Sequence, residues 1–143
     1  MDSYYQSEYF IENILAFRNY KHESTSWSRE KYIYSNLWHF DNFIADKLKV
    51  FILLNNNINR LTGATKVINK NNSKKLVRNF RFSHTSLVNK KLDEYIIKKE
   101  IINYFEGNIG DIYIVNAQSC LHAASIPIDA NYRDMIQFEI LKK

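Results

Sequence analysis

Hydrophobic residues recur along this chain with two different spacings, one typical of helices and one typical of strands. Between residues 7 and 20 the apolar positions follow one another at steps of three and four, which predicts an amphipathic N-terminal helix. The polar stretch 21–30 then indicates a loop. A second set of helical spacings, over residues 92–105, predicts another helix that ends near Gly107.

The other apolar runs are short and rich in β-branched and aromatic residues, as strands are. They predict strands at residues 32–40, 47–54, 63–68, 111–116, 120–125 and 132–141. The Asn- and Lys-rich run 69–75 predicts a loop. Short strands with few helices, and no alternating βαβ units, favour a mainly β barrel or sandwich backed by a few helices.

Composition changes this picture little. At 143 residues the chain fits one domain, 1–143, with an N-terminal helix and loop in 1–30 and the barrel in 31–143. A net charge of +5 would suit an anionic partner, but the lysines stand in scattered pairs, which indicates solvated surface rather than a nucleic-acid site. We also expect a cytoplasmic protein without a membrane segment, because there is no basic leader and no apolar run of about 20 residues. The single cysteine, Cys120, excludes an internal disulfide and is expected to pack as a small hydrophobe.

Two histidines and one aspartate are the candidate metal ligands. His39 and Asp41 are two residues apart in a predicted strand, so their side chains point to the same face. His122 lies on a later predicted strand that could pack beside the first. Two imidazoles and a carboxylate suit ferrous iron and leave three coordination positions open. The remaining histidines, His22 and His84, match no ligand position.

The sequence around these residues resembles a known family. Residues 35–41, followed by 47–54 and by 62–64, resemble the phytanoyl-CoA dioxygenase-like family of Fe(II)/2-oxoglutarate oxygenases. Residues 110–125 look like that family's distal-histidine strand and turn, and 132–138 look like its arginine strand. The similarity runs from about residue 32 to residue 140, with the middle insertion unmatched.

This resemblance implies a double-stranded β-helix, or jelly roll, with Fe(II) held by His39, Asp41 and His122 at the barrel mouth. It implies that 2-oxoglutarate chelates the iron while Arg133 pairs with its far carboxylate, for which a guanidinium is a planar, permanently charged partner. The implied activity is a dioxygenase that uses dioxygen to hydroxylate a small-molecule substrate and releases succinate and CO2. Within the superfamily, an intact Asp41 favours hydroxylation over halogenation.

Several residues have a structural alternative. Arg133 could form a surface salt bridge with Asp134 or Glu139, although strand alternation places it on the more polar face of its strand, away from the apolar one. Trp38 and Phe40 are expected to pack in the core behind the metal strand.

Weaker expectations concern four polar residues and the turn near Gly110. Lys47 and Lys49 are expected on a solvated face, and Thr65 and Gln137 are candidate contacts of 2-oxoglutarate. Asp111 is expected to bond backbone amides at the turn beside Gly110.

Two other functions stay open. One is a shortened jelly roll, about half as long as typical relatives, that binds a metal or serves in assembly without oxygenase activity. The other is an oxygenase that acts on nucleic acid or protein. The loop after the third strand also departs from the Pro-Gly-Ser-His stretch of many relatives, because residues 68–74 read Ile-Asn-Lys-Asn-Asn-Ser-Lys here.

Overall fold

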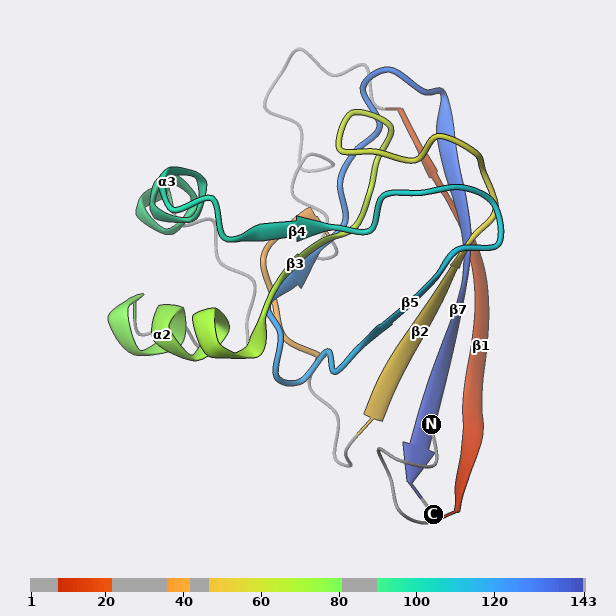
Figure 1. Ribbon diagram of the computed structural model, residues 1–143, viewed down its shortest axis with the longest axis horizontal. Coiled ribbons are helices and arrows are strands. Elements are labelled where there is room, and N and C mark those ends of the chain that lie inside the picture. The colour runs from red at the N-terminus through yellow and green to blue at the C-terminus, as the bar shows by residue number, and fades with distance from the viewer. Residues whose placement is uncertain (1–7, 22–35, 42–46, 81–89, 143) are drawn as a thin grey trace.

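The computed structural model describes residues 8–21, 36–41, 47–80 and 90–142, and its strands form two antiparallel sheets (Figure 1). The first sheet contains β1 (Tyr9–Tyr20), β2 (Lys47–Leu53), β5 (Ile112–Val115) and β7 (Tyr132–Lys142), in the order β1-β7-β2-β5. The second contains β3 (Lys66–Ile68), β4 (Ile102–Tyr104) and β6 (His122–Ala123), in the order β4-β3-β6. Neighbours within each sheet come from distant parts of the chain, so the sheets form only when the whole chain is folded.

The mainly β architecture predicted from the sequence is confirmed. An isolated antiparallel bridge between His39 and His122 adds the segment around His39 to the second sheet, beside β6. With that segment, chain order alternates between the two sheets except at β3 and β4, which follow one another in the second sheet, as in a double-stranded β-helix. The strand pairs of the described residues leave two separate sheets rather than a closed barrel.

The N-terminal helix predicted over residues 7–20 is wrong, because the segment is strand β1. All its residues except Glu12 pair with β7, and a bulge lies between Ile11 and Asn13. β1 carries apolar side chains on both faces: Ile14 is exposed on the outer face, whereas Phe17 lines a cavity on the inner one. Apolar residues on two faces, with a bulge that shifts their alternation, imitate the spacing of a helix.

The loop predicted over residues 69–75 is also wrong, since helix α2 (Lys70–Phe80) begins there. Asn69 caps the helix: its side-chain oxygen accepts a hydrogen bond of 2.9 Å from the backbone N–H of Asn72. Ser73 and Leu76 are buried on one side of α2. Burial of that side, rather than the overall polarity of the segment, stabilises the helix.

The second predicted helix is shorter than expected. α3 (Lys90–Lys98) ends before Glu100, whose φ of 50° is left-handed and incompatible with a continuing helix. The next residues form β4, so the predicted end at Gly107 is wrong. The strand predicted from Gly63 likewise begins late, at Lys66, because Gly63 occupies a turn with φ of 98°.

Two hydrophobic clusters support the sheets. One lies between the sheets and joins Phe51 and Met135 of the first to Val67 of the second. The other lies outside the second sheet, under α2 and α3 (Figure 1). Trp38 and Phe40 belong to this outer cluster, as predicted.

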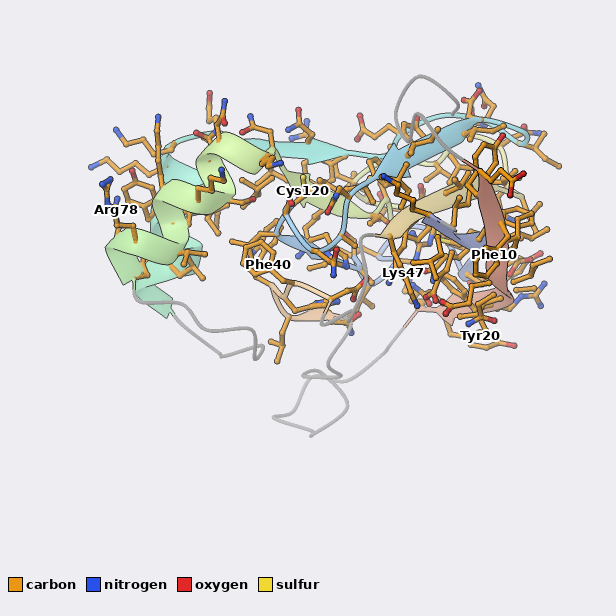
Figure 2. The ribbon with its side chains drawn as sticks, turned by 90° about the horizontal axis from the view of Figure 1, so that it is seen from below. Phe10, Tyr20, Phe40, Lys47, Arg78 and Cys120 are labelled. Carbon is orange, nitrogen blue, oxygen red and sulfur yellow. The ribbon has the colours of Figure 1, made fainter. Side chains whose placement is uncertain are left out.

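The helices and β1 lie on opposite sides of the molecule. Figure 2 shows Arg78 of α2 far from Phe10 and Tyr20 of β1. Neither helix of the described residues is long and apolar enough to cross a membrane.

Candidate metal centre

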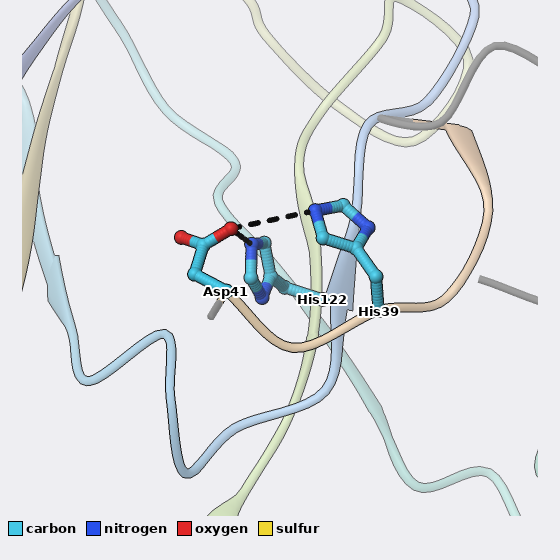
Figure 3. Close-up of side chains that lie close together, drawn as sticks. All are labelled: His39, Asp41 and His122. Carbon is cyan, nitrogen blue, oxygen red and sulfur yellow. Dashed lines mark ion pairs between the residues drawn. The ribbon is translucent and has the colours of Figure 1, made fainter. Parts of the chain in front are cut away.

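Backbone pairing brings His39, Asp41 and His122 together. The N–H of each histidine donates to the carbonyl of the other, at 3.1 Å in both directions. Two residues further on, the N–H of Asp41 donates to the carbonyl of Ala117. One ligand atom from each of the three side chains lies within 4.8 Å of the other two (Figure 3). The convergence predicted from residue spacing is therefore present.

Both imidazoles turn Nε2 toward the place where the three side chains meet, and both bond a backbone carbonyl through Nδ1. Nδ1 of His39 lies 2.7 Å from the carbonyl oxygen of Leu37, and Nδ1 of His122 lies 3.1 Å from that of Cys120. A carbonyl oxygen only accepts, so each Nδ1 carries the proton and donates it. In a neutral ring with its proton on Nδ1, Nε2 has the lone pair that a metal needs, and the backbone contact fixes the orientation of the ring.

The carboxylate of Asp41 completes the ligand set. Its Oδ1 lies 3.8 Å from Nε2 of His39 and 3.6 Å from Nε2 of His122 (Figure 3). Its Oδ2 forms an ion pair with Nζ of Lys49 on β2. Burial alone would raise the pKa of this carboxyl, but the nearby imidazole of His122 and the charge of Lys49 outweigh it and lower the pKa to about 2.

His39 and Asp41 have the protonation states that a divalent metal needs. His39 is only 5% exposed, and burial, followed by the electrostatic effect of His122, lowers its pKa to about 4. A neutral imidazole and an ionised carboxylate are thus present at neutral pH without any metal. These residues fit Fe(II) or a similar divalent ion, with three positions of an octahedron left open.

Arg133 lies inside the same fold, buried and only 1% exposed. One guanidinium nitrogen donates a 2.7 Å hydrogen bond to the hydroxyl of Thr65, while the buried Nε has no hydrogen-bond partner among the described residues. Burial lowers the pKa of Arg133 to about 10, so the group stays charged. No carboxylate of the described segments pairs with it, and Asp134 pairs instead with Arg18, at 2.6 Å. The surface salt bridge that sequence allowed for Arg133 is therefore not formed with Asp134.

A cavity of about 410 Å³ contains both groups of residues. Its wall includes His39, Asp41, Lys49, Thr65, His122, Arg133, Gln137 and Glu139, together with Leu15, Phe17, Asn19, Phe51 and Ala124. The polar face of β7 thus points inward, as the alternation around Arg133 suggested. A buried cation and a set of metal donors in one cavity are suited to an anion that also contacts the metal.

The two lysines of β2 correct the sequence prediction. They were expected on a solvated face, yet the side chains of Lys47 and Lys49 are only 13% and 12% exposed. Lys47 pairs with Glu12 and, at 3.8 Å, with Glu139, whereas Lys49 pairs with Asp41. Strand alternation could have predicted this burial, because both lysines lie on the same face of β2 as Phe51, and that face points inward.

Two of three minor expectations have outcomes in the structure. Asp111 accepts a 2.8 Å hydrogen bond from the N–H of Asn108, so it stabilises the turn that contains Gly110. Cys120 is a free thiol packed beside the hydrophobic cluster that lies between the sheets, and burial raises its pKa. His22 and His84 lie outside the described residues.

Comparison with known proteins supports the fold but not a family. No family model matches the sequence, and no curated protein matches it significantly. The structure is similar to EvdMO1, with a TM-score of 0.63 at 12% identity over 99% of this chain. It is also similar to apo HygX from Streptomyces hygroscopicus, with a TM-score of 0.59 at 9% identity over 96% of this chain.

HygX has also been crystallised with ligands. The form with nickel and 2-oxoglutarate gives a TM-score of 0.58 at 8% identity, and the form that also contains hygromycin B gives 0.53 at 9%. The match spans 29% of EvdMO1 and 60% of apo HygX, so this chain corresponds to part of each. At these identities the likeness shows the fold alone, which agrees with the predicted double-stranded β-helix.

Proposed function

We propose that this chain is an Fe(II)- and 2-oxoglutarate-dependent dioxygenase that hydroxylates a small molecule. One observation carries the proposal: two Nε2 atoms and Oδ1 of Asp41 converge in a cavity that also contains the buried guanidinium of Arg133. The guanidinium of Arg133 can pair with a carboxylate, and the two Nε2 atoms and Oδ1 of Asp41 can bind a metal ion. 2-Oxoglutarate satisfies both demands, because a keto acid chelates the metal at one end and carries a second carboxylate at the other.

His39, Asp41 and His122 would hold the iron, each through one atom. The carbonyl groups of Leu37 and Cys120 keep the imidazoles in the required tautomer, so binding requires no rearrangement of protons on the rings. When bound, the iron and co-substrate supply the oxidation: one atom of dioxygen enters the substrate, and the other enters the succinate formed from 2-oxoglutarate as CO2 leaves.

Arg133 would anchor the far carboxylate of 2-oxoglutarate. The hydroxyl of Thr65 holds one nitrogen of the guanidinium, while the buried Nε has no partner in the described protein. An incoming carboxylate could satisfy that donor and neutralise the buried charge. Gln137 lines the same cavity and is a second candidate contact.

A small molecule is the proposed substrate because the cavity, at about 410 Å³, has the size of a small-ligand site. HygX, which shares the fold, has been crystallised with hygromycin B. A nucleic-acid substrate would be indicated instead if the protein bound oligonucleotides with an affinity that fell steeply with salt.

The test is 2-oxoglutarate turnover. Wild-type protein supplied with Fe(II), ascorbate and dioxygen should form succinate, whereas His39→Ala and Asp41→Ala should reduce succinate to background while retaining the wild-type circular dichroism spectrum. Succinate formation at the wild-type rate by either folded variant would refute the assignment.

A second measurement separates the oxygenase from a metal-binding module. Anaerobic addition of Fe(II) and then 2-oxoglutarate should produce a visible metal-to-ligand charge-transfer band, and Arg133→Met should require far more 2-oxoglutarate to reach it. Iron binding without that band at any co-substrate concentration would favour the module without oxygenase activity.

A further inference from the structure

The two oxygens of Asp41 have different partners. Oδ1 faces both histidines, whereas Oδ2 is held by Nζ of Lys49, which reaches it from β2. Both side chains of this ion pair are 12% exposed. Two opposite charges in contact attract each other strongly when they are buried, because solvent and salt screen them little. The ion pair therefore favours one rotation of the carboxylate, with Oδ1 alone turned toward the two Nε2 atoms.

Coordination chemistry makes this rotation consequential. A metal bound by two imidazoles and one carboxylate oxygen keeps three of six positions open. A keto acid that chelates takes two of them and dioxygen takes the third. If Asp41 instead coordinated through both oxygens, as carboxylates can, only two positions would remain, and chelation would leave none for dioxygen.

We propose that Lys49 is a positioning residue that keeps Asp41 monodentate and so preserves the third open position of the metal. This inference rests on the proposed metal site and goes beyond it, since it assigns a role to a cation outside the ligand set. Lys49 acts through Oδ2 of Asp41, and the position that it preserves is one that the co-substrate and dioxygen require.

Lys47 provides a matched control. It lies two residues earlier on the same face of β2 and is buried to nearly the same extent, with 13% of its side chain exposed. Its partners are Glu12 and Glu139 rather than a candidate ligand. Replacing Lys47 removes a similar buried charge but leaves the Asp41 carboxylate held.

The experiment titrates Co(II), and then 2-oxoglutarate, into the anaerobic protein, with the d–d absorption spectrum as readout. Lys49→Met should retain Co(II) binding as tight as wild type or tighter, because a cation near the metal is gone and a second carboxylate oxygen can bind. Its Co(II) spectrum should differ from wild type before any co-substrate is added. Its affinity for 2-oxoglutarate should fall by about 10–100-fold, a loss of the size found in metal affinity or activity when a group that orients a metal ligand is removed.

Two variants complete the design. Lys49→Arg keeps a cation and donors for Oδ2 and should restore the wild-type spectrum and 2-oxoglutarate affinity, and Lys47→Met should leave both unchanged. If Lys49→Met does not fold, Lys49→Gln, which retains an N–H donor without the charge, replaces it, with a smaller change in the same direction expected.

Three outcomes would overturn the role of Lys49. An unchanged Co(II) spectrum with weaker 2-oxoglutarate binding would mean that Lys49 contacts the co-substrate directly. Loss of Co(II) affinity with an unchanged spectrum would mean a general packing role, and wild-type behaviour in both titrations would mean no role. Failure of the proposed function differs from all three, because it would appear in the wild-type protein itself. Either its Co(II) spectrum would not depend on His39, or 2-oxoglutarate would leave that spectrum unchanged.

Discussion

At the scale of single residues, Arg133 shows the conflict between stability and ligand binding most clearly. Its guanidinium is removed from water, yet the described protein provides only the hydroxyl of Thr65 as an acceptor and no carboxylate. A buried charge without an ionic partner costs several kcal/mol. Such a cost is expected where the missing partner is a ligand, and it predicts that the folded protein without ligand would gain stability from losing this charge.

Arg133→Met should therefore raise the free energy of unfolding by about 1–3 kcal/mol in the absence of ligands, because it replaces a buried charge with an apolar side chain of similar reach. The same variant should bind 2-oxoglutarate at least about tenfold more weakly. Urea unfolding and co-substrate titration measure the two effects. Arg133→Lys is the control, since it keeps the charge and should show no gain in stability. A variant that is both less stable and unchanged in 2-oxoglutarate affinity would contradict the proposed role.

At the scale of elements, Ser73 connects helix α2 to the strand that carries His122. Its hydroxyl donates to the carbonyl of Ile68 and accepts from the N–H of Leu121, both at 2.9 Å, and the residue is fully buried. Leu121 immediately precedes His122. Helix α2, whose first residues were predicted to form a loop, thus fixes the backbone beside a candidate metal ligand.

Ser73→Ala should lower the free energy of unfolding by about 1–3 kcal/mol, because it leaves a buried N–H and a buried carbonyl without their partner. Lys74→Ala, at the exposed neighbouring position of α2, should stay within about 0.5 kcal/mol of wild type. Urea midpoints of the two variants, compared at constant denaturant slope, provide the measurement. Equal midpoints would show that the Ser73 bridge contributes nothing.

At the scale of the whole molecule, the site depends on both sheets. His39 and His122 belong to the second sheet, Lys49 and Arg133 to the first, and the cavity lies between them. A metal bound by the three ligands would join segments that are distant in sequence. Metal binding and folding are then coupled, because the unfolded chain has no preformed site.

Co(II) at 100 times its dissociation constant should stabilise the wild-type fold by about 2.7 kcal/mol, the mass-action value for a ligand that binds only the native state. Thermal unfolding with increasing Co(II) measures this as a rising melting temperature. His122→Ala should lose most of the rise, since two donors remain. An equal rise in wild type and His122→Ala would indicate that cobalt binds elsewhere.

Local sequence patterns predicted some elements well and failed at others for identifiable reasons. The strands around Phe51 and Ile136 were found because runs of β-branched and aromatic residues are a local property. Strand β1 was missed because its apolar residues face two ways, and α2 was missed because the residues that stabilise it, such as Leu76, do so by packing against distant segments. Propensity is a weak guide where tertiary contacts decide.

The sequence by itself determined the mainly β class and the candidate ligands, because residues two apart in an extended segment, such as His39 and Asp41, turn toward the same face. Only the tertiary structure decided that His122 pairs with His39, that Arg133 is buried with no carboxylate partner in the described segments, and that Lys49 pairs with the second oxygen of Asp41. These facts depend on which strands become neighbours and which faces turn inward. Pairing between segments distant in sequence determines the neighbours and the inward faces, and this pairing cannot be predicted from a short stretch of sequence.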